Sequence, residues 1–394
     1  GGVDIRGLTN THPVTLNLVQ ASLRIRGEVE LATGFVLTAS ESDAFLVSPS
    51  ILLSGGALWS GFTLRNGSTL KLAGLTQIAG STGPGWGFSA LSGSLIELPE
   101  LSKADGVSAF VADGTNSVIR LPNVSKISNA TGSGGVSGTG GIFARAGGAI
   151  EIPQLKSLKN SCLYLYQNGY VDFSSLTSMR DSNVVLAETN VVFGSLTSLD
   201  GTVLSAEKGA HLSFPALTEW NAYAARSFGV EATGTNSLVE FPNLTVISDI
   251  RPSSGGGEIS YFSAVQAGRV LLPNLTEAFG GVNFSAGNGV GSVVSLDRLE
   301  RISGNASLSP GTTSVSASFG GKVLLPQLQE SESTLFEVTL GSFPETDLTL
   351  SSLQSVVGSS LRTHGRAYVL ESLTNATSSK FEAYSGGEIV LPAL

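Results

Sequence analysis

The most regular feature of the sequence is a short alternation of apolar and polar positions that returns along the chain. It has the form Φ-x-Φ-P-x-L-x-x-Φ, where Φ is apolar, and clear copies read IELPELSKA, IRLPNVSKI, LSFPALTEW and VEFPNLTVI. In a strand, every second side chain points to the same face. Each Φ-x-Φ step therefore predicts a short strand with one buried face.

The copies form a repeat with a variable period. If the second Φ of each copy is taken as its reference residue, 14 copies follow one another at intervals of 20 to 31 residues. Such periods are typical of solenoids. The shortest intervals define a basic coil, and the longer ones hold Gly/Ser-rich insertions such as residues 130–141 and 251–260. The reference residues are Leu72, Leu98, Leu121, Ile152, Phe173, Phe193, Phe214, Phe241, Leu272, Leu296, Leu325, Leu350, Leu370 and Leu391.

The other positions of the repeat predict how each coil bends. Proline follows the reference residue in eight copies, and the third residue after it is Leu in 13 of 14. Because proline cannot donate to a central ladder, it indicates a corner between two short strands. A further strand follows, as at residues 184–186 and 203–205, and then a Gly turn. We therefore predict an all-β fold, a single-stranded parallel β-helix (β-solenoid) with three-strand coils of about 20 residues and Gly/Ser-rich loop insertions.

Two regions differ in how well they keep the repeat. Residues 1–69 lack the proline but keep the alternation in VTLNLV and FVLTAS, so we expect degenerate coils or a cap there. Residues 70–394 form the repeat region proper, whose last copy stops mid-repeat at Leu394, and we expect flanking domains in the same chain. A leucine-rich repeat has a similar period. The lack of helix-forming stretches argues against it.

Composition narrows the function classes. Charged residues are 13% of the chain and the net charge is −9, which argues against nucleic acid as a partner. The sequence contains no apolar run of 18 residues, so no membrane span is predicted. Cys162 is the single cysteine, so it forms no internal disulfide and we expect a buried small side chain. The histidines His12, His211 and His364 show no ligand spacing, and we expect neither a metal site nor a cofactor.

The SLTSL, LPALT and LPNLT blocks with their Gly-rich turns, between Leu70 and Leu394, carry a resemblance. They resemble the β-solenoid passengers of large bacterial surface and secreted proteins, of the adhesin and autotransporter type. The repeat lengths are less regular than in the haemagglutinin-like pattern. The resemblance implies an extracellular, secreted or cell-surface scaffold segment of a larger protein, structural or adhesive and without catalysis. Its partner would be a polysaccharide or a component of a host or neighbouring cell surface.

Parallel β-helices also include polysaccharide lyases and hydrolases, which place carboxylates and cations on neighbouring coils. The outward position between the two Φ residues offers such a set in five successive copies: Lys71, Glu97, Arg120, Glu151 and Asp172. This outer-face column predicts either a groove that carries an acid and a base or a ladder of charges that keeps the sheet soluble. Further along, the same column contains apolar residues such as Val192, Val369 and Val390, which suggests that a loop or a partner covers it.

Three further groups offer weaker signals. Tyr164, Tyr166 and Tyr170 lie in one coil and are candidates for stacking on a glycan, although packing at a strand edge is the alternative. Glu330, Glu332 and Glu337 suggest a solvated loop. Eight N-x-S/T sequons occur, and three of them arise from the LPN[LV][TS] form of the repeat itself. Non-catalytic scaffolding is the leading function, with a carbohydrate-binding or polysaccharide-degrading β-helix as the alternative.

Overall fold

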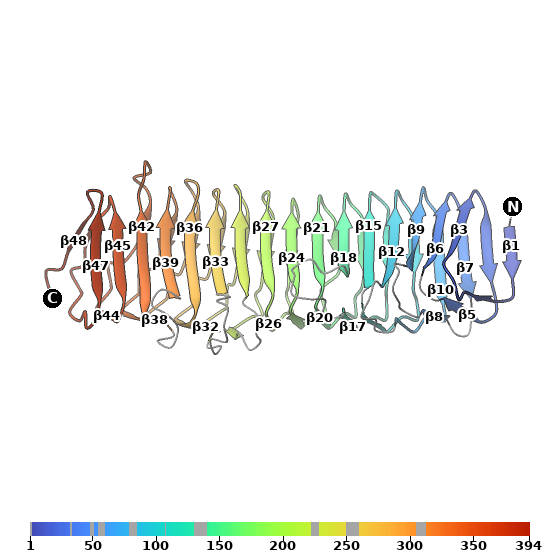
Figure 1. Ribbon diagram of the computed structural model, residues 1–394, viewed down its shortest axis with the longest axis horizontal. Helices are drawn as coiled ribbons and strands as arrows, with labels where there is room; N and C mark the ends of the chain where they lie inside the picture. The colour runs from blue at the N-terminus through green and yellow to red at the C-terminus, as the bar shows by residue number, and fades with distance from the viewer. Residues whose placement is uncertain are drawn as a thin grey trace. The chain divides into compact units, whose positions relative to one another are not determined.

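The computed structural model describes residues 2–31, 34–47, 51–53, 60–78, 85–106, 108–129, 140–221, 228–249, 260–304 and 313–394. Within these ranges the regular structure consists of strands, with no helix, which excludes the leucine-rich alternative. The chain divides into two compact units, Gly1–Thr189 and Asn190–Leu394. Each unit is a parallel β-solenoid in which a strand pairs with the third strand before and after it along the chain, except at the end of the second unit, where β45 pairs with β47 and β46 with β48 (Figure 1). The predicted fold is confirmed.

Each coil of the first unit has three sides, which we call the motif side, the second side and the long side. The motif side holds the Φ-x-Φ strands β1 (Gly2–Ile5), β4 (Ser22–Ile25), β7 (Asp43–Val47), β10 (Thr69–Ala73), β13 (Leu95–Glu97), β16 (Val118–Arg120), β19 (Ala149–Glu151) and β22 (Tyr170–Val171). The second side holds β2 (Leu8–Thr9), β5 (Val29–Leu31) and β8 (Ile51–Leu53) in one sheet and β11 (Gln77–Ile78), β14 (Lys103–Asp105), β17 (Lys126–Ser128), β20 (Ser157–Lys159) and β23 (Ser178–Arg180) in another. The long side holds β3 (Val14–Val19), β6 (Phe35–Ser40), β9 (Ser60–Arg65), β12 (Trp86–Leu91), β15 (Ser108–Asp113), β18 (Gly141–Arg145), β21 (Cys162–Tyr166) and β24 (Asn183–Ala187).

The second unit repeats the same three sides. Its motif side holds β25 (Asn190–Val192), β28 (His211–Ser213), β31 (Leu238–Glu240), β34 (Arg269–Leu271), β37 (Val293–Ser295), β40 (Lys322–Leu324) and β43 (Asp347–Leu348), then β46 (Ala367–Val369) and β48 (Glu388–Val390) as a separate pair. The second side holds β26 (Ser198–Asp200), β29 (Glu219–Asn221), β32 (Val246–Asp249), β35 (Glu277–Gly280), β38 (Arg301–Ser303), β41 (Glu330–Glu332) and β44 (Ser355–Val357). The long side holds β27 (Val203–Glu207), β30 (Gly229–Thr233), β33 (Ser260–Val265), β36 (Val282–Gly287), β39 (Thr313–Ser318), β42 (Thr334–Thr339), β45 (Ser360–His364) and β47 (Lys380–Tyr384).

The proline of the motif lies at the corner between the motif side and the second side. In the coil of β13, the Leu101 N–H donates to the Leu98 carbonyl at 3.4 Å across a four-residue turn with Pro99 at its second position. Proline is favoured there because its fixed φ suits the turn and no N–H is needed. The two ends of the turn are fully buried. The Φ-P-x-L motif is therefore a turn whose first and last side chains both enter the core, as the sequence predicted.

The Asn and Thr residues of the LPNLT form make hydrogen bonds to the turn of the preceding coil. Asn243 Nδ2 donates to the Pro215 carbonyl at 2.8 Å, and Asn274 Nδ2 donates to the Pro242 carbonyl at 2.6 Å. Two residues later, Thr245 Oγ1 donates to the Thr218 carbonyl at 3.0 Å. The asparagines thus supply a donor to the proline carbonyls, and Thr245 adds a second donor to the Thr218 carbonyl, which already accepts the Thr245 N–H. This structural use explains why the repeat generates N-x-S/T sequons.

The long side returns to the motif side through tight turns. In the turn after β18, Ala146 has φ 51° and Gly147 φ 79°, and the Gly148 N–H donates to the Arg145 carbonyl. Two successive positive φ values define a type I′ turn, which favours glycine. Turns one residue longer end on a buried serine instead: Ser117 Oγ donates to the Asp113 carbonyl and accepts from the Gly93 N–H below it.

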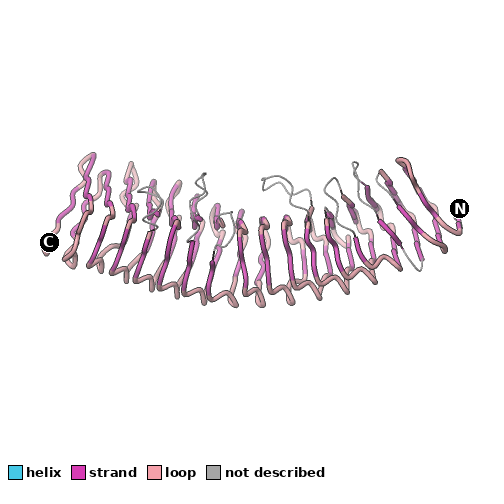
Figure 2. The backbone as a smooth tube through the Cα atoms, turned by 60° about the horizontal axis from the view of Figure 1, so that its bottom comes forward, coloured by secondary structure: helices cyan, strands magenta, loops and turns pink. Residues whose placement is uncertain are grey.

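Inserted residues enter the coil between the second side and the long side. The ranges 54–59, 79–84, 130–139, 222–227, 250–259 and 305–312 all connect a second-side strand to a long-side strand. Most of the added length thus enters at one position in the repeat, as the intervals predicted. The corner between the long side and the motif side also varies, from two residues between β45 and β46 to seven between β42 and β43; Figure 2 shows the stacked coils. The residues within the predicted insertions 130–139 and 251–259 lie outside the described part.

The core of each unit is a stack of inward side chains. Thirteen of the 14 reference residues are buried, and Leu391 in the last coil is half-buried. In the first unit Phe62, Phe88 and Phe110 stack with centroids 5.4 Å apart. In the second, Phe193, Phe214 and Phe241 stack at 5.1 Å. The rings on successive coils pack face to face because strand spacing fixes their separation at about 4.8 Å.

Candidate functional site

The outer-face column of the first unit lies on its motif side. Lys71 on β10, Glu97 on β13, Arg120 on β16 and Glu151 on β19 are paired in register on successive strands. Arg120 lies between the two carboxylates, with NH1 3.1 Å from Glu97 Oε1 and Nε 2.9 Å from Glu151 Oε2. Lys71 Nζ is 4.0 Å from Glu97 Oε2. The structure thus brings four of the five predicted residues together as an ion-paired ladder.

The electrostatics of this ladder favour fixed charges. The hydrogen bonds that Arg120 donates to Glu97 and then to Glu151 raise its pKa above its already high ordinary value. An arginine so placed remains a cation and does not act as a base. Asp172 follows β22, and its Oδ1 accepts the Ser174 N–H at 2.9 Å, which makes it a local turn residue. What these side chains form is an ion-pair network of coil-to-coil contacts.

The apolar continuation of the column, in the second unit, is unevenly covered. Val192 is 63% exposed, Val369 54% and Val390 37%. Ser213 and Ser295 in the same column are buried, and Leu271 and Leu324 are half-buried. No described residue therefore covers the valines at either end of this strip, and a partner for it stays a prediction.

The three candidate tyrosines do not share one face. Tyr164 and Tyr166 point outward from the long-side strand β21, whereas Tyr170 lies on β22 of the motif side, around the corner, and is 56% exposed. Tyr164 stacks on Phe143 of β18 with centroids 5.3 Å apart and an interplanar angle of 16°. The sequence prediction missed Phe143, which the register places opposite Tyr164. Phe143, Tyr164 and Tyr166 form an outward aromatic strip in which one face of the Tyr164 ring is already covered.

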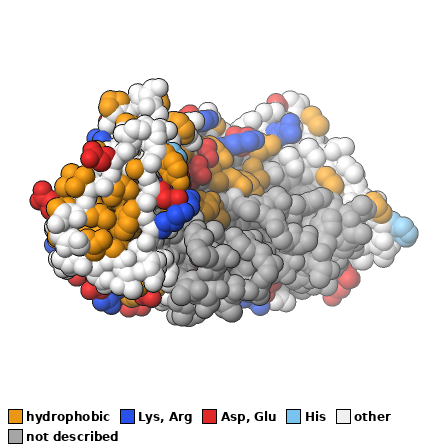
Figure 3. Space-filling view, turned by 60° about the vertical axis from the view of Figure 1, so that its left-hand side comes forward, with side chains coloured by type: hydrophobic (Ala, Val, Ile, Leu, Met, Phe, Trp, Pro, Cys, Tyr) orange, Lys and Arg blue, Asp and Glu red, His pale blue; other side chains and the backbone are white. Residues whose placement is uncertain are grey.

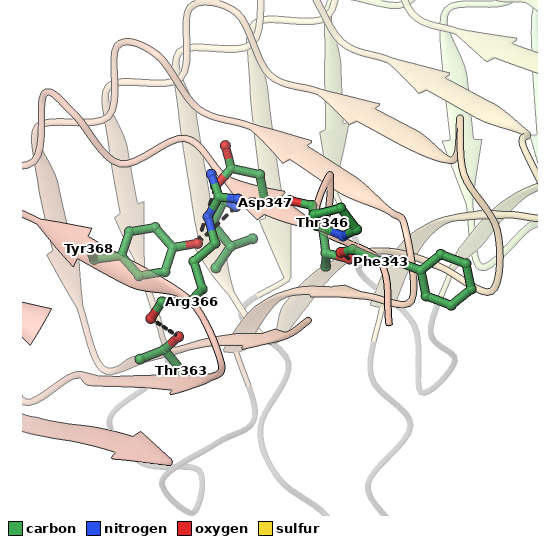
Figure 4. Close-up of polar contacts among 8 residues, drawn as sticks. Phe343, Thr346, Asp347, Thr363, Arg366 and Tyr368 are labelled. Atoms are coloured by element: carbon green, nitrogen blue, oxygen red, sulfur yellow. Dashed lines mark hydrogen bonds and ion pairs between the residues drawn. The ribbon is translucent and has the colours of Figure 1, made fainter. Parts of the chain in front are cut away.

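A polar cluster around the buried Tyr368 interrupts the motif side near the end of the second unit. The Leu348 N–H donates to the Tyr368 hydroxyl at 3.1 Å, and that hydroxyl lies 3.4 Å from Asp347 Oδ1. Arg366 NH2 is 3.1 Å from the same carboxylate oxygen, and Arg366 NH1 donates to the Pro344 carbonyl. Figure 4 shows Tyr368 and Arg366 both pointing toward Asp347. Because the tyrosine takes an N–H that a strand would otherwise pair, the sheet ends at β43 and a new one begins at β46.

Burial raises the pKa of Tyr368 well above its ordinary value. A phenol so placed stays protonated at neutral pH and is a poor general base. The cluster fastens the coil of β46 to the coil of β43 through side chains in place of the backbone ladder. Its geometry is that of a structural contact.

Other charged groups of the second unit also lie on strands. Glu330 and Glu332 belong to β41 and Glu337 to β42, so the expectation of a solvated loop was wrong; the single residue Ser333 at the corner between the two strands leaves no room for one. Arg301 on β38 lies in register between Glu277 and Glu330, with NH2 2.6 Å from Glu330 Oε2. Glu330 therefore belongs to a second ion-pair ladder, with Arg301 and Glu277.

A third ladder crosses the long side at β42, β45 and β47. Arg362 is in register with Glu337 and Glu382, and its Nε lies 2.7 Å from Glu382 Oε2. Hydrogen bonds from Lys380, Arg362 and Tyr384 lower the pKa of Glu382 to about 2. His364 stacks on Tyr384 at 4.8 Å. All three ladders place an arginine between two glutamates on successive coils.

A hollow with a mostly apolar lining lies among the last coils of the described part. Phe336, Leu353, Leu361, Leu370 and Phe381 line it. Ser359 and Ser379 also reach it, but both hydroxyls are bonded to backbone groups of neighbouring coils. Figure 3 shows apolar side chains gathered inside a rim of backbone at the end that carries the C-terminus. The hollow is a continuation of the core and offers no set of converging polar groups.

Other site classes find little support in the described ranges. No group of three or more His, Cys, Asp and Glu side chains is placed to hold a metal ion there. His211 Nε2 lies 3.2 Å from Glu240 Oε1, on coils far from His12 and His364. Cys162 is buried. No described helix is long and apolar enough to cross a membrane.

The sequence interpretation also missed a group of lysines on the second side of the first unit. Lys103, Lys126, Lys156 and Lys159 all lie on or beside β14, β17 and β20, and we call them the basic strip. Lys103 and Lys126 occupy the fifth position after the reference residue in consecutive copies. An alignment of the copies at that position, outside the Φ-x-Φ step, would have found these two lysines but not Lys156 or Lys159.

Comparisons with known proteins returned no match: no family model fits the chain, and neither a curated protein nor a solved structure is similar to it.

Proposed function

We propose that this chain is a non-catalytic β-helical scaffold, a structural or adhesive segment of a secreted or surface-displayed protein. The observation that carries the proposal is the pairing of its outward charges. The residues that could have served as acid and base, Glu97 and Glu151, are both held by Arg120. Fixed ion pairs on a continuous core suit a rigid support. The extracellular location rests on the resemblance of the repeat to surface and secreted β-solenoids.

The test separates binding from turnover. The chain is incubated with a panel of neutral and anionic polysaccharides, and retained polymer and new chain ends are measured together. We expect no new chain ends with any polymer. Cleavage would overturn the proposal, and a Glu97→Gln, Arg120→Gln, Glu151→Gln variant would then show whether the column is the site. The matched control is Glu277→Gln, Arg301→Gln, Glu330→Gln, which removes the same groups from another ladder.

A second candidate function is carbohydrate binding at the aromatic strip. It is favoured by the parallel rings of Phe143, Tyr164 and Tyr166 on one outward face, since aromatic side chains present flat apolar surface with a polar edge. Replacing Tyr164 and Tyr166 by Ala should abolish retention of a neutral glycan, while Tyr170→Ala, on another side of the coil, should leave it unchanged. Equal retention by all variants would exclude the strip.

A further inference from the structure

The basic strip departs from the charge pattern of the rest of the molecule. In the three ladders, each arginine has a glutamate on both neighbouring strands. On the second side of the first unit, Lys103 on β14 is instead in register with Lys126 on β17. Like charges directly opposite one another on paired strands are destabilising. This arrangement occurs in a chain whose net charge is −9, so overall charge does not account for it.

Few carboxylates offset these lysines. Asp105 lies 2.6 Å from Lys103 Nζ and 4.0 Å from Lys126 Nζ, so one carboxylate serves two ammonium groups. Lys156 and Lys159, in the next coil, have no carboxylate within 4.0 Å among the residues that the structure places. Lys156 is exposed and Lys159 half-buried. Their positive charge is thus open to an external anion.

Two connecting segments of the first unit also lack acidic residues in their sequence. Residues 79–84 and 130–139, which connect β11 to β12 and β17 to β18, contain no Asp or Glu. Of the acids in these coils, Glu100 is exposed at the proline corner, and Asp181 Oδ2 lies 3.8 Å from Arg180 Nε. Four lysines therefore face solvent around one shared carboxylate.

The spacing and neighbours of the lysines indicate the kind of anion. Paired strands lie about 4.8 Å apart, so the charges recur along the stacking direction and match a linear polyanion better than a single ion. Ser157 is in register with Lys126 and Ser128 with Lys159, so each adds a hydroxyl group beside one lysine. The strands β14, β17 and β20 carry no aromatic side chain on which bases could stack, which disfavours single-stranded nucleic acid.

We propose that the basic strip binds an acidic polysaccharide along the second side of the first unit, with Lys103, Lys126, Lys156 and Lys159 as contacts to its carboxylate or sulfate groups. This proposal adds a ligand class to the proposed scaffold function. It rests on that function in one respect: the polymer is bound and is not cleaved.

The experiment measures binding of the intact chain to a polyuronate, and to the same polymer with its carboxyl groups methyl-esterified. We expect binding of the acidic form alone, weakened by added salt because exposed charges are screened. A Lys126→Gln, Lys159→Gln variant should bind about tenfold more weakly. The control, Lys208→Gln with Lys322→Gln, removes two cations from other faces and should bind like the unaltered chain. Circular dichroism checks that each variant folds.

Several results would overturn the proposal. If both double variants bound the polyuronate equally weakly, the effect would be one of net charge. If the esterified polymer bound as well, recognition would not depend on the charge of the polymer. Tighter binding of a single-stranded oligonucleotide than of the polyuronate would assign the strip to nucleic acid. Cleavage of the polyuronate would contradict the scaffold function while leaving the strip as its binding surface, so the two proposals can fail separately.

Discussion

At the scale of single residues, the repeat is maintained by side chains that complete backbone hydrogen bonds at the corners. Asn243 and Asn274 each donate to the carbonyl of the proline in the turn below. Ser117 satisfies both its own turn and the one beneath it. Corners carry the carbonyl and N–H groups that the short strands leave unpaired, so polar residues are needed there as much as apolar ones are in the core.

The asparagine contact gives a first prediction. Asn243→Ala should lower the free energy of unfolding by about 1 kcal/mol, because the Pro215 carbonyl loses its side-chain donor. Gln154 occupies the same turn position in the coil of β19 and is exposed, so Gln154→Ala should change stability by less than about 0.5 kcal/mol. Urea unfolding of both variants makes the comparison. An equal loss of stability in both variants would mean that the turn conformation, and not the hydrogen bond of the side chain, determines the change in unfolding free energy.

Tyr368 gives a prediction about pH. The folded state holds the phenol proton more tightly than the unfolded state, because burial raises the Tyr368 pKa. Its contribution is therefore complete below the ordinary tyrosine pKa of about 10 and declines as the pH rises above that value. Tyr368→Phe should cost about 1–3 kcal/mol at pH 7, where the Leu348 N–H loses its acceptor, and should reduce the loss of stability between pH 9 and 11. Unfolding midpoints across this range test it; an unchanged alkaline slope would contradict it.

At the scale of elements, parallel stacking converts a position in the repeat into a column of neighbours. The Glu97–Arg120–Glu151 ladder joins β13, β16 and β19 although its members are 23 and 31 residues apart along the chain. The same spacing places Lys103 against Lys126 on the second side. Whether a column stabilises the coils or strains them is decided by the signs of the charges that occupy it.

Two charge reversals in one coil test this point. Arg120→Glu would place three glutamates in succession on the motif side and should destabilise the fold by about 1–2 kcal/mol. Lys126→Glu, six residues later, makes the same charge change beside Lys103 and should leave stability unchanged or raise it slightly. The difference should shrink in high salt. Thermal unfolding at low and high salt measures both, and equal losses would show that the signs of the neighbours do not matter.

At the scale of the molecule, each unit is a stack in which a coil contacts the coils next to it, so stability is approximately a sum of coils and interfaces. The Phe193–Phe214–Phe241 stack is one such set of interfaces in the second unit. Trp220 and Phe262 pack against Phe241 from neighbouring strands. A substitution in this stack should therefore destabilise the neighbouring coils before it destabilises the rest of the unit.

Phe241→Ala tests the local character of the stack. Loss of a fully buried ring should cost about 3–5 kcal/mol. Hydrogen exchange should accelerate first in β28, β31 and β34, and least in β45 and β47 of the same unit. Phe319→Ala, at an exposed turn, is the control and should change exchange little beyond its own turn. Uniform acceleration throughout the unit would show that it opens as one block.

The sequence by itself determined the coil. Inward positions, the proline corner and the site of insertion follow from a local pattern, because strand alternation and turn chemistry depend on residues only a few positions apart. It also placed Lys71, Glu97, Arg120 and Glu151 in one column, since the column is a fixed position of the repeat. It grouped Tyr170 wrongly with Tyr164, because the corner between β21 and β22 turns them to different sides.

Only the tertiary structure decided which side chains meet across coils. Phe143 stacks on Tyr164, and Lys103 faces Lys126, because the register pairs strands separated by insertions of unequal length. The interruption at Tyr368 likewise depends on a side chain reaching a backbone N–H 20 residues away. A repeat pattern carries no information about such contacts, since they arise where individual coils depart from it.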